Sequence, residues 1–417
     1  MVILVDTNIL MDVIANREPY AEYGKRILEK CAKREVTGIM ATAAGVNTLC
    51  CVASLMLRQF ATGLLTAHSW NPETGMERVL KYGIACFQKR CRVMILMDYI
   101  HRALEERLQK YEKTYKAILV TGARQVGKST LLRKVFADRK YVTLDDPFME
   151  QQAKEAGDLF LTLNPPPITI DEVQRAKELF RYIKIKCDES GEKGVFCLSG
   201  SQPFHLMQNV SESLSGRIGI LELSGLSMRE SCGDPFNRHF LPTLEYVAQR
   251  RKTGKKPENI WEVIHRGGYP ELWNGQKEWS AFYADYVRTY VERDVRDLAA
   301  VQDLNAFRQL LIAAAARTGE ILNYSAIASE IGKDVGTVKS WISILEASGI
   351  VYLLEPYTSG LLKRVIRSPK LYFRDTGLVC YLTRWLTAEN LAYGAMSGPV
   401  LETFAVSEIL KSFSNGN

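Results

Sequence analysis

The chain has 417 residues, of which 47% are hydrophobic and 24% charged, with a formal net charge of +7. These values are ordinary for a soluble chain of two to four globular domains. Nine cysteines without a C-x-x-C pair and five scattered histidines argue against a disulfide framework and a zinc site. Asp6 interrupts the opening apolar run, and Arg58 and Gln59 split the apolar stretch 45–67, so we expect a cytoplasmic protein without a signal peptide or membrane span.

Residues 1–58 predict a short α/β fragment. An apolar strand from Val2 leads to Asp6, a helix follows it, and a second short strand is expected over 36–44. Asp6 opens the motif D-T-N, and together with N-R-E-P-Y at 16–20 this motif resembles the PIN-domain nucleases of the toxin type.

That resemblance implies a cluster of three or four carboxylates around Mg²⁺ or Mn²⁺. Only Asp6 can be carried over, because no aspartate occurs between Asp12 and Asp98. One carboxylate does not hold a catalytic hard cation without further oxygen ligands. We therefore expect a PIN-like remnant without nuclease activity, and linker or remnant helices over 59–96. A PIN-type RNase is the weakest alternative function.

A nucleotide-binding core is predicted over 97–230. A charged amphipathic helix over 99–113 precedes the apolar strand 117–120, and G-A-R-Q-V-G-K-S follows at 122–129. This sequence is a full match to G-x-x-x-x-G-K-[ST] between a strand and a helix, the context of a phosphate-binding loop. The residues expected to bind ATP are Gly122, Ala123, Arg124, Gln125, Val126, Gly127, Lys128, Ser129 and Thr130.

Within this loop, Lys128 is expected to reach the β- and γ-phosphates, and the Ser129 hydroxyl to ligate Mg²⁺. The second motif of the site is acidic. It follows Pro165-Pro166-Pro167, where the strand 168–170 ends in Asp171 and Glu172. In a doubly wound sheet ligands bind at the carboxyl ends of the strands. We therefore expect Asp171 to order Mg²⁺ through water and Glu172 to polarise the attacking water.

Two further residues are candidates for sensing the nucleotide. Ser201 follows a third strand that starts at Val195, with Ser199 behind it, and its hydroxyl can bond the γ-phosphate or the attacking water. Arg217 follows a small-residue turn and suits an arginine finger, although a salt-bridged surface arginine fits the spacing equally well.

The elements between these motifs alternate between strand and helix. A strand at 141–144, a helix to about 163, the strand ending at Asp171 and a helix over 173–187 precede the strand at Val195. This alternation predicts a parallel sheet with helices on both faces.

Beyond Leu223 the pattern becomes helical, and we expect a helical lid over 231–320. Residues 321–367 read as a helix-turn-helix with a wing: a helix to Ile331, a turn at Gly332, a helix over 335–347 and a strand over 350–354. Its exposed helix face would carry Thr337, Lys339 and Ser340.

A basic stretch over 361–374 contains Lys363, Arg364, Arg367, Lys370 and Arg374 and no acid. It could neutralise several phosphates of double-stranded DNA. Packing of the winged helix on its own ATPase, or on another protein, is the equal alternative.

Six motifs occur in order along 97–417: G-A-R-Q-V-G-K-S, I-D-E-V-Q, L-S-G-S, S-G-R, G-G-Y-P and S-P-K-L-Y-F-R-D-T-G-L. Together they resemble the bacterial and archaeal AAA-type P-loop ATPases that carry a winged helix and a C-terminal nuclease-like domain. The resemblance implies a five-stranded AAA-type core and a requirement for ATP and Mg²⁺. The nuclease-like part, 368–417, is expected to be an incomplete start of that domain, with Glu402 as its first acid and no metal.

The sequence thus predicts an AAA-type ATPase that couples Mg²⁺-dependent ATP hydrolysis to remodelling of DNA or protein. Hydrolysis would move the winged helix relative to the core. The alternative is a nucleotide-dependent binding switch with little turnover. A homo-oligomer is compatible with either function, and the sequence does not name the client.

Overall fold

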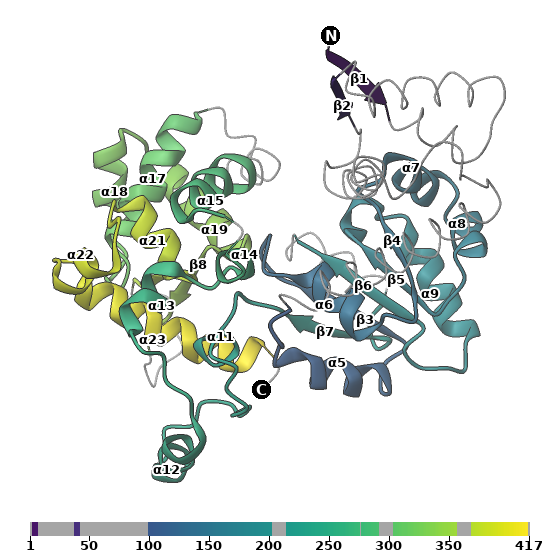
Figure 1. Cartoon of the computed structure of the whole chain (residues 1–417), viewed down its shortest axis with the longest axis horizontal. Coiled ribbons are helices and arrows are strands. Elements are labelled where there is room, and N and C mark those ends of the chain that lie inside the picture. The colour runs from purple at the N-terminus through teal and green to yellow at the C-terminus, as the bar shows by residue number, and fades with distance from the viewer. Residues whose placement is uncertain are drawn as a thin grey trace, which may run out of the picture. The chain divides into compact units, whose positions relative to one another are not determined.

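The computed structural model describes residues 2–6, 37–41, 99–201, 214–275, 277–291, 303–356 and 368–415 (Figure 1). The chain divides into two compact units, Met1–Tyr99 and Ile100–Asn417.

The first unit contains two parallel strands, β1 (Val2–Asp6) and β2 (Thr37–Ala41). Asp6 is the last residue of β1 and lies opposite Ala41. Strands were expected at both places. The apolar stretch 45–67 and the segment 59–96 lie outside the described residues, and so does every other acid of residues 1–58.

The second unit opens with a five-stranded parallel sheet. Its strands are β3 (Ala117–Thr121), β4 (Lys140–Thr143), β5 (Ile168–Asp171), β6 (Phe196–Gly200) and β7 (Ile218–Glu222). Their order in space is β4-β5-β6-β3-β7, and every neighbouring pair is parallel. The predicted parallel sheet is confirmed, and β7 is a strand that the residue pattern did not locate.

Helices flank this sheet (Figure 1). They are α5 (Leu104–Glu112), α6 (Lys128–Val135), α7 (Pro147–Glu155), α8 (Gly157–Leu163) and α9 (Leu179–Glu189). The helix predicted over 173–187 is wrong in its first turns, because a 3-10 turn at Val173–Arg175 precedes α9. Glu172, in the left-handed conformation, redirects the chain at that point.

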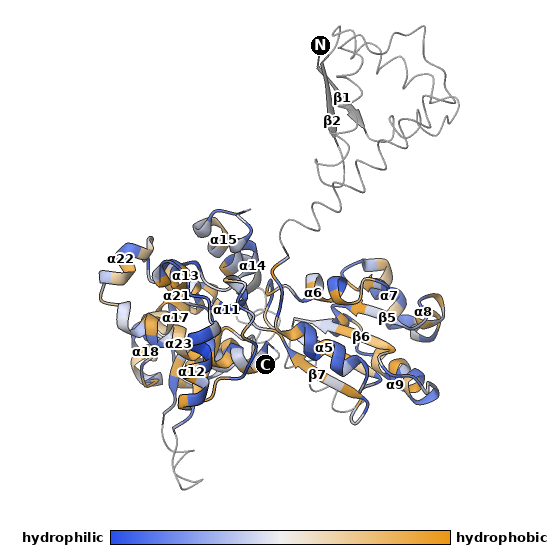
Figure 2. Cartoon of the chain, turned by 60° about the horizontal axis from the view of Figure 1, so that its bottom comes forward, coloured by the Kyte–Doolittle hydropathy of each residue, from blue (hydrophilic) through white to orange (hydrophobic). Residues whose placement is uncertain are grey.

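The core of the second unit follows from the apolar strands. All residues of β3, β5 and β6 are buried, which is expected for parallel strands covered on both faces. Phe160, Phe180 and Phe196 are fully buried in the cluster on one side of the sheet. Figure 2 shows β5 and β6 coloured mainly as hydrophobic.

The rest of the second unit is mainly helical. Its first elements are α11 (Met228–Ser231), α12 (Leu244–Thr253), α13 (Ile260–Arg266), α14 (Pro270–Trp273), α15 (Trp279–Tyr286), the π-helix η2 (Val287–Val291) and α17 (Leu304–Ala316). After α17 come α18 (Tyr324–Ile331), α19 (Val335–Ala347), β8 (Val351–Leu354), β9 (Lys370–Phe373), α21 (Thr376–Leu382), α22 (Ala388–Tyr393) and α23 (Ser397–Ser414).

Two of the sequence motifs meet in this helical part. The Asp375 carboxylate, from R-D-T-G-L, caps α21 and accepts a hydrogen bond from the Gly268 amide at 2.7 Å. It also accepts one from the Tyr283 hydroxyl at 2.7 Å. Asp375 therefore fixes the G-G-Y-P loop against β9 and α21.

Candidate functional site

The phosphate-binding loop lies between β3 and α6. Gly122, Gln125 and Gly127 have positive φ angles of 147°, 61° and 95°. A Cβ on Gly122 would lie 2.1 Å from the Leu223 carbonyl oxygen, so no other residue fits there. The loop ends at the N-terminus of α6, whose first amides have no partner inside the helix.

Lys128 is the first residue of α6, and its side chain folds back onto the loop. Its ammonium donates to the carbonyl oxygens of Gly122 at 3.0 Å and Ala123 at 2.8 Å. The residue is 6% exposed. The Lys128 ammonium is therefore already directed at the loop.

The Asp171 carboxylate lies directly beside the loop. The Ser129 hydroxyl donates to its Oδ2 at 2.8 Å. The hydroxyls of Tyr141 and Ser199 also donate to Asp171. The expected pair of loop serine and strand-end acid is thus brought together, and Asp171 is only 5% exposed.

Tyr141, on the neighbouring strand β4, was not foreseen from the sequence. Burial, followed by its hydrogen bond to Asp171, raises the pKa of Tyr141 to about 12. The phenol therefore stays protonated at neutral pH and donates to the carboxylate. The guanidinium of Arg133 stacks over its ring, 4.0 Å from the centroid.

Glu172 and Ser201 also meet. Glu172 has φ 56° and ψ 41°, an uncommon conformation for a residue with a side chain. Its Oε2 accepts a hydrogen bond from the Ser201 hydroxyl at 3.1 Å and another from the Gln174 amide. Gln174 is the last residue of the motif I-D-E-V-Q, and the residue pattern alone does not predict its contact with Glu172.

Arg217 does not lie at the phosphate loop. It precedes β7 at the amino edge of the sheet, because Ile218 pairs with Ala117, whereas the phosphate loop follows the carboxyl end of β3. A five-residue strand, about 16 Å long, separates the two edges. Arg217 forms an exposed ion pair with Asp188. Of the two readings of Arg217, the structure favours the surface salt bridge, and it does not bring Arg217 to the phosphate loop.

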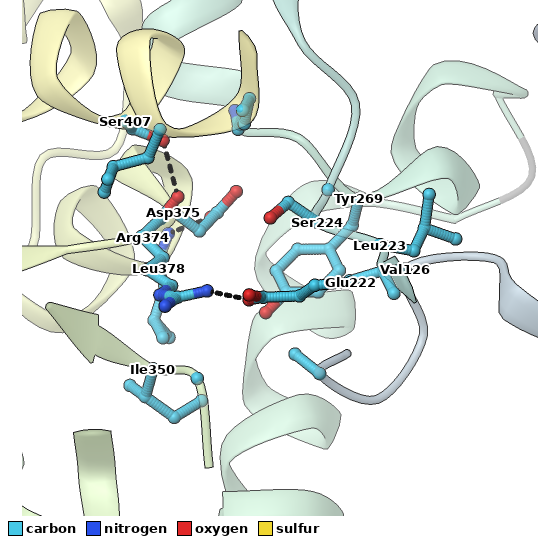
Figure 3. A pocket seen from close by; sticks show the side chains of 15 residues that line it. Val126, Glu222, Leu223, Ser224, Tyr269, Ile350, Arg374, Asp375, Leu378 and Ser407 are labelled. Atoms are coloured by element: carbon cyan, nitrogen blue, oxygen red, sulfur yellow. Dashed lines mark hydrogen bonds and ion pairs between the residues drawn. The ribbon is translucent and has the colours of Figure 1, made fainter. Parts of the chain in front are cut away.

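Arg374 was expected to contribute to a DNA-binding stretch, and the structure pairs it with an acid. Its guanidinium pairs with Glu222 at the end of β7, as Figure 3 shows. The pocket around this pair is also lined by Ala123 and Val126 of the phosphate loop and by Tyr269. Arg374 thus faces the P-loop core.

The other described residues of the predicted DNA-binding face differ in their contacts and exposure. Lys370 pairs with Glu402 at 2.9 Å. Lys339 and Ser340 are exposed on α19, whereas the Thr337 hydroxyl bonds the helix-capping Asp334. Lys363, Arg364 and Arg367 lie outside the described residues.

Mg²⁺ prefers oxygen ligands, usually one or two from protein together with substrate phosphates. The Ser129 hydroxyl and the Asp171 carboxylate supply this kind of donor. Among the described residues there is no group of three His, Cys, Asp or Glu side chains able to hold a metal on its own. None of the described helices is both long and apolar enough to cross a bilayer.

Comparison with known families agrees with this geometry. Residues 114–232 match the model of an AAA domain. This segment is therefore similar to AAA domains. Residues 257–389 match the model of a domain of unknown function (DUF8612). The first match contains the phosphate loop, Asp171, Glu172 and Ser201, and the second contains the G-G-Y-P and R-D-T-G-L motifs.

The curated relatives that match this chain are distant in sequence. Two uncharacterized proteins, from Mycobacterium tuberculosis and Mycobacterium bovis, are each 28% identical over 316 residues. The match covers 74% of this chain and 65% of each relative, so the chain spans less than two thirds of their length.

Two solved structures show fainter likenesses. A Walker-type ATPase of Pyrococcus abyssi has a TM-score of 0.39 at 18% identity, over 68% of this chain and 96% of that one. AMPPCP-bound DnaA from Aquifex aeolicus has a TM-score of 0.29 at 15% identity, over 58% and 85%.

Proposed function

We propose that this chain binds ATP with Mg²⁺ at residues 122–130 and hydrolyses it. The observation that carries the proposal is the 2.8 Å hydrogen bond between Ser129 and Asp171, which unites the two halves of the motif. The AAA family match over 114–232 supports nucleotide binding. Hydrolysis and the role of Mg²⁺ go beyond that match.

Each residue receives a role from its position. The loop amides and Lys128 bind the phosphates, and Lys128 exchanges its carbonyl partners for phosphate oxygens. Ser129 ligates Mg²⁺, and Asp171 orders it through water. Bound Mg²⁺ neutralises the charge that develops on the β- and γ-phosphate oxygens. Glu172 positions the attacking water, and Ser201 holds the Glu172 carboxylate.

The decisive experiment replaces Glu172 by Gln, with the exposed Glu192→Gln as a matched control. Steady-state ATP hydrolysis is expected to fall at least a hundredfold in Glu172→Gln, because general-base catalysis contributes roughly 10²–10⁴-fold. Binding of MgATP, measured by calorimetry, is expected to remain. Unchanged hydrolysis in Glu172→Gln would reject the role of Glu172, and no binding of MgATP by the wild-type protein would reject the whole proposal.

A nucleotide-dependent switch is the second candidate. It is favoured by two features of Glu172. Its carboxylate is held by Ser201 and Gln174, and its backbone has a strained left-handed conformation. In a switch, MgATP binds tightly while wild-type turnover is close to background and Glu172→Gln changes neither quantity. The same two measurements therefore separate the enzyme from the switch.

The partner is a proposal as well. Helices α18 and α19 and the β8–β9 hairpin have the element order of a winged helix, which suits double-stranded DNA. Against this, Lys370 and Arg374 are paired with acids. ATPase rates with and without double-stranded DNA, at low and high salt, decide the matter. Stimulation that fades with salt supports DNA, and none at any salt supports a protein client.

A further inference from the structure

A buried polar chain runs from the phosphate loop to the end of helix α23. It consists of Arg102, Glu230 and Asn415, which are 3%, 7% and 0% exposed. None of the three belongs to a sequence motif discussed above. They come from the segment before α5, from α11 and from the C-cap of α23.

Arg102 holds the phosphate loop by its backbone. Its Nη1 donates to the Val126 carbonyl oxygen at 2.7 Å, and its Nη2 donates to the Ser224 carbonyl oxygen at 2.7 Å. In a trans peptide the carbonyl and the next N–H point in opposite directions. Because Arg102 draws the Val126 carbonyl outward, the Gly127 amide is turned away from Arg102, toward the other side of the loop backbone.

Glu230 neutralises Arg102 and fixes its direction. Its Oε1 accepts from Arg102 Nε at 3.0 Å and from the Ala103 amide at 2.9 Å. Burial alone would raise the pKa of Glu230, but the charge of Arg102 and the donors at Ser227 and Ala103 outweigh it. The net shift lowers the pKa, so the carboxylate stays charged and the pair stays intact at neutral pH.

Asn415 ties this pair to helix α23. Its side-chain nitrogen Nδ2 donates to Glu230 Oε2 at 2.9 Å and to the Gly225 carbonyl oxygen at 3.0 Å. Its side-chain oxygen Oδ1 accepts a hydrogen bond from the Ser224 backbone N–H at 2.9 Å. Ser224 is therefore held by Asn415 on its N–H and by Arg102 on its carbonyl.

We propose that Arg102 is a positioning residue for the phosphate loop, and that Glu230 and Asn415 transmit the docking of helix α23 to that loop. When α23 is docked, the loop amides are ordered before the nucleotide arrives, and the cost of ordering them is removed from binding. When the contact at Asn415 is lost, Arg102 and Glu230 gain freedom and the loop loosens. This inference rests on the proposed nucleotide site for its effect on affinity, but the ordering of the loop does not depend on it.

The test compares Asn415→Ala with Asn390→Ala, an exposed asparagine on α22. Hydrogen exchange of the backbone amides in 122–129 is measured without nucleotide, and the affinity for MgATP by fluorescence anisotropy. We expect Asn415→Ala to exchange faster in this loop and to bind MgATP at least fivefold more weakly, the lower end of typical coupling between sites. Asn390→Ala is expected to match the wild type in both.

Arg102→Lys provides a conservative second variant, because lysine keeps the charge but cannot bridge Val126 and Ser224 with a planar fork. We expect it to weaken MgATP binding while the turnover at saturating nucleotide stays within about twofold.

Loop exchange in Asn415→Ala equal to that of the wild type would overturn the inference. So would faster exchange throughout the second unit, because that indicates general loosening. Faster loop exchange with unchanged MgATP affinity would show that the docking of α23 does not affect nucleotide binding, and would overturn that part of the inference. If the wild type itself does not bind MgATP, the proposed function fails, and loop exchange still decides whether α23 orders the loop.

Discussion

The hydroxyl of Ser129 lies 2.8 Å from Oδ2 of Asp171, although 42 residues separate them in the chain. Ser129 is the second residue of helix α6, which follows β3, and Asp171 ends β5, with β6 between the two strands. Parallel strands bring their carboxyl ends to one edge, and this is why two separate motifs form one site. Because of this contact, we expect the proposed Mg²⁺ dependence to rest on Ser129.

Replacement of Ser129 by Ala is expected to abolish the effect of Mg²⁺ on nucleotide affinity. The wild type should bind ATP more tightly with Mg²⁺ than in a chelator, and the variant equally in both, because the direct protein ligand is gone. Calorimetry in the two buffers measures this. Ser343→Ala, an exposed serine of α19, is the control. A persistent Mg²⁺ effect in Ser129→Ala would place the metal elsewhere.

Tyr141→Phe tests the unforeseen donor to Asp171. A hydrogen bond to a charged group contributes about 1.5–3 kcal/mol, so the free energy of unfolding should fall by up to that amount. The pKa of the phenol is raised to about 12, so its contribution is complete below pH 10 and is lost only as pH rises toward 12.

The loss in Tyr141→Phe is therefore expected to be the same at pH 7 and pH 9, as measured by urea unfolding. Tyr393→Phe, at a tyrosine that is 90% exposed, should change the unfolding free energy by less than about 0.5 kcal/mol. A loss that differed strongly between the two pH values would show that Tyr141 titrates in this range and does not serve as a fixed donor.

The sequence predicted the features that depend on neighbouring residues in the chain, such as helix bounds and motifs at strand ends. The helix Val335–Ala347 has the predicted bounds because Asp334 caps its start and its apolar residues keep helical spacing. The phosphate loop, Asp171 and Glu172 were found because each follows an apolar strand. Tyr141 and Asn415 were not found, because they contact Asp171 and Glu230 across 30 and 185 residues. Such contacts depend on strand order and helix docking, which no short window of sequence contains.

Glu230→Gln is expected to destabilise the protein by about 3–5 kcal/mol at pH 7, because it leaves the buried Arg102 without a counter-charge. The pKa of Glu230 is lowered in the fold. Its carboxylate therefore contributes stability above the ordinary pKa near 4.5, and this contribution is lost as pH falls through the lowered value.

Urea unfolding of the wild type and of Glu230→Gln should consequently converge as the pH is lowered below 4.5. Glu258→Gln, at an exposed position, should run parallel to the wild type. A difference between wild type and Glu230→Gln that stayed constant through this range would mean that Glu230 is not charged in the native protein.

Arg217→Ala is expected to leave MgATP affinity and turnover unchanged in a dilute, monomeric sample, because Arg217 lies at the opposite edge of the sheet from the phosphate loop. Loss of its exposed ion pair with Asp188 should alter stability by less than about 1 kcal/mol. Turnover that fell in the monomer would contradict this placement. A fall seen only at concentrations where the chain self-associates would instead assign Arg217 to the site of a neighbouring copy.

Arg374 and Lys363 separate the two readings of the basic stretch. If the stretch binds double-stranded DNA, removing a phosphate-contacting cation should lower the slope of log affinity against log salt by about 1. Arg374 is committed to Glu222 beside the phosphate loop, so Arg374→Ala should leave the slope unchanged, whereas Lys363→Ala should lower it. Titration of a fluorescent duplex at several salt concentrations measures both slopes. A lower slope for Arg374→Ala would show that this arginine leaves Glu222 for DNA, and equal, unchanged slopes for both variants would remove the stretch from the DNA interface.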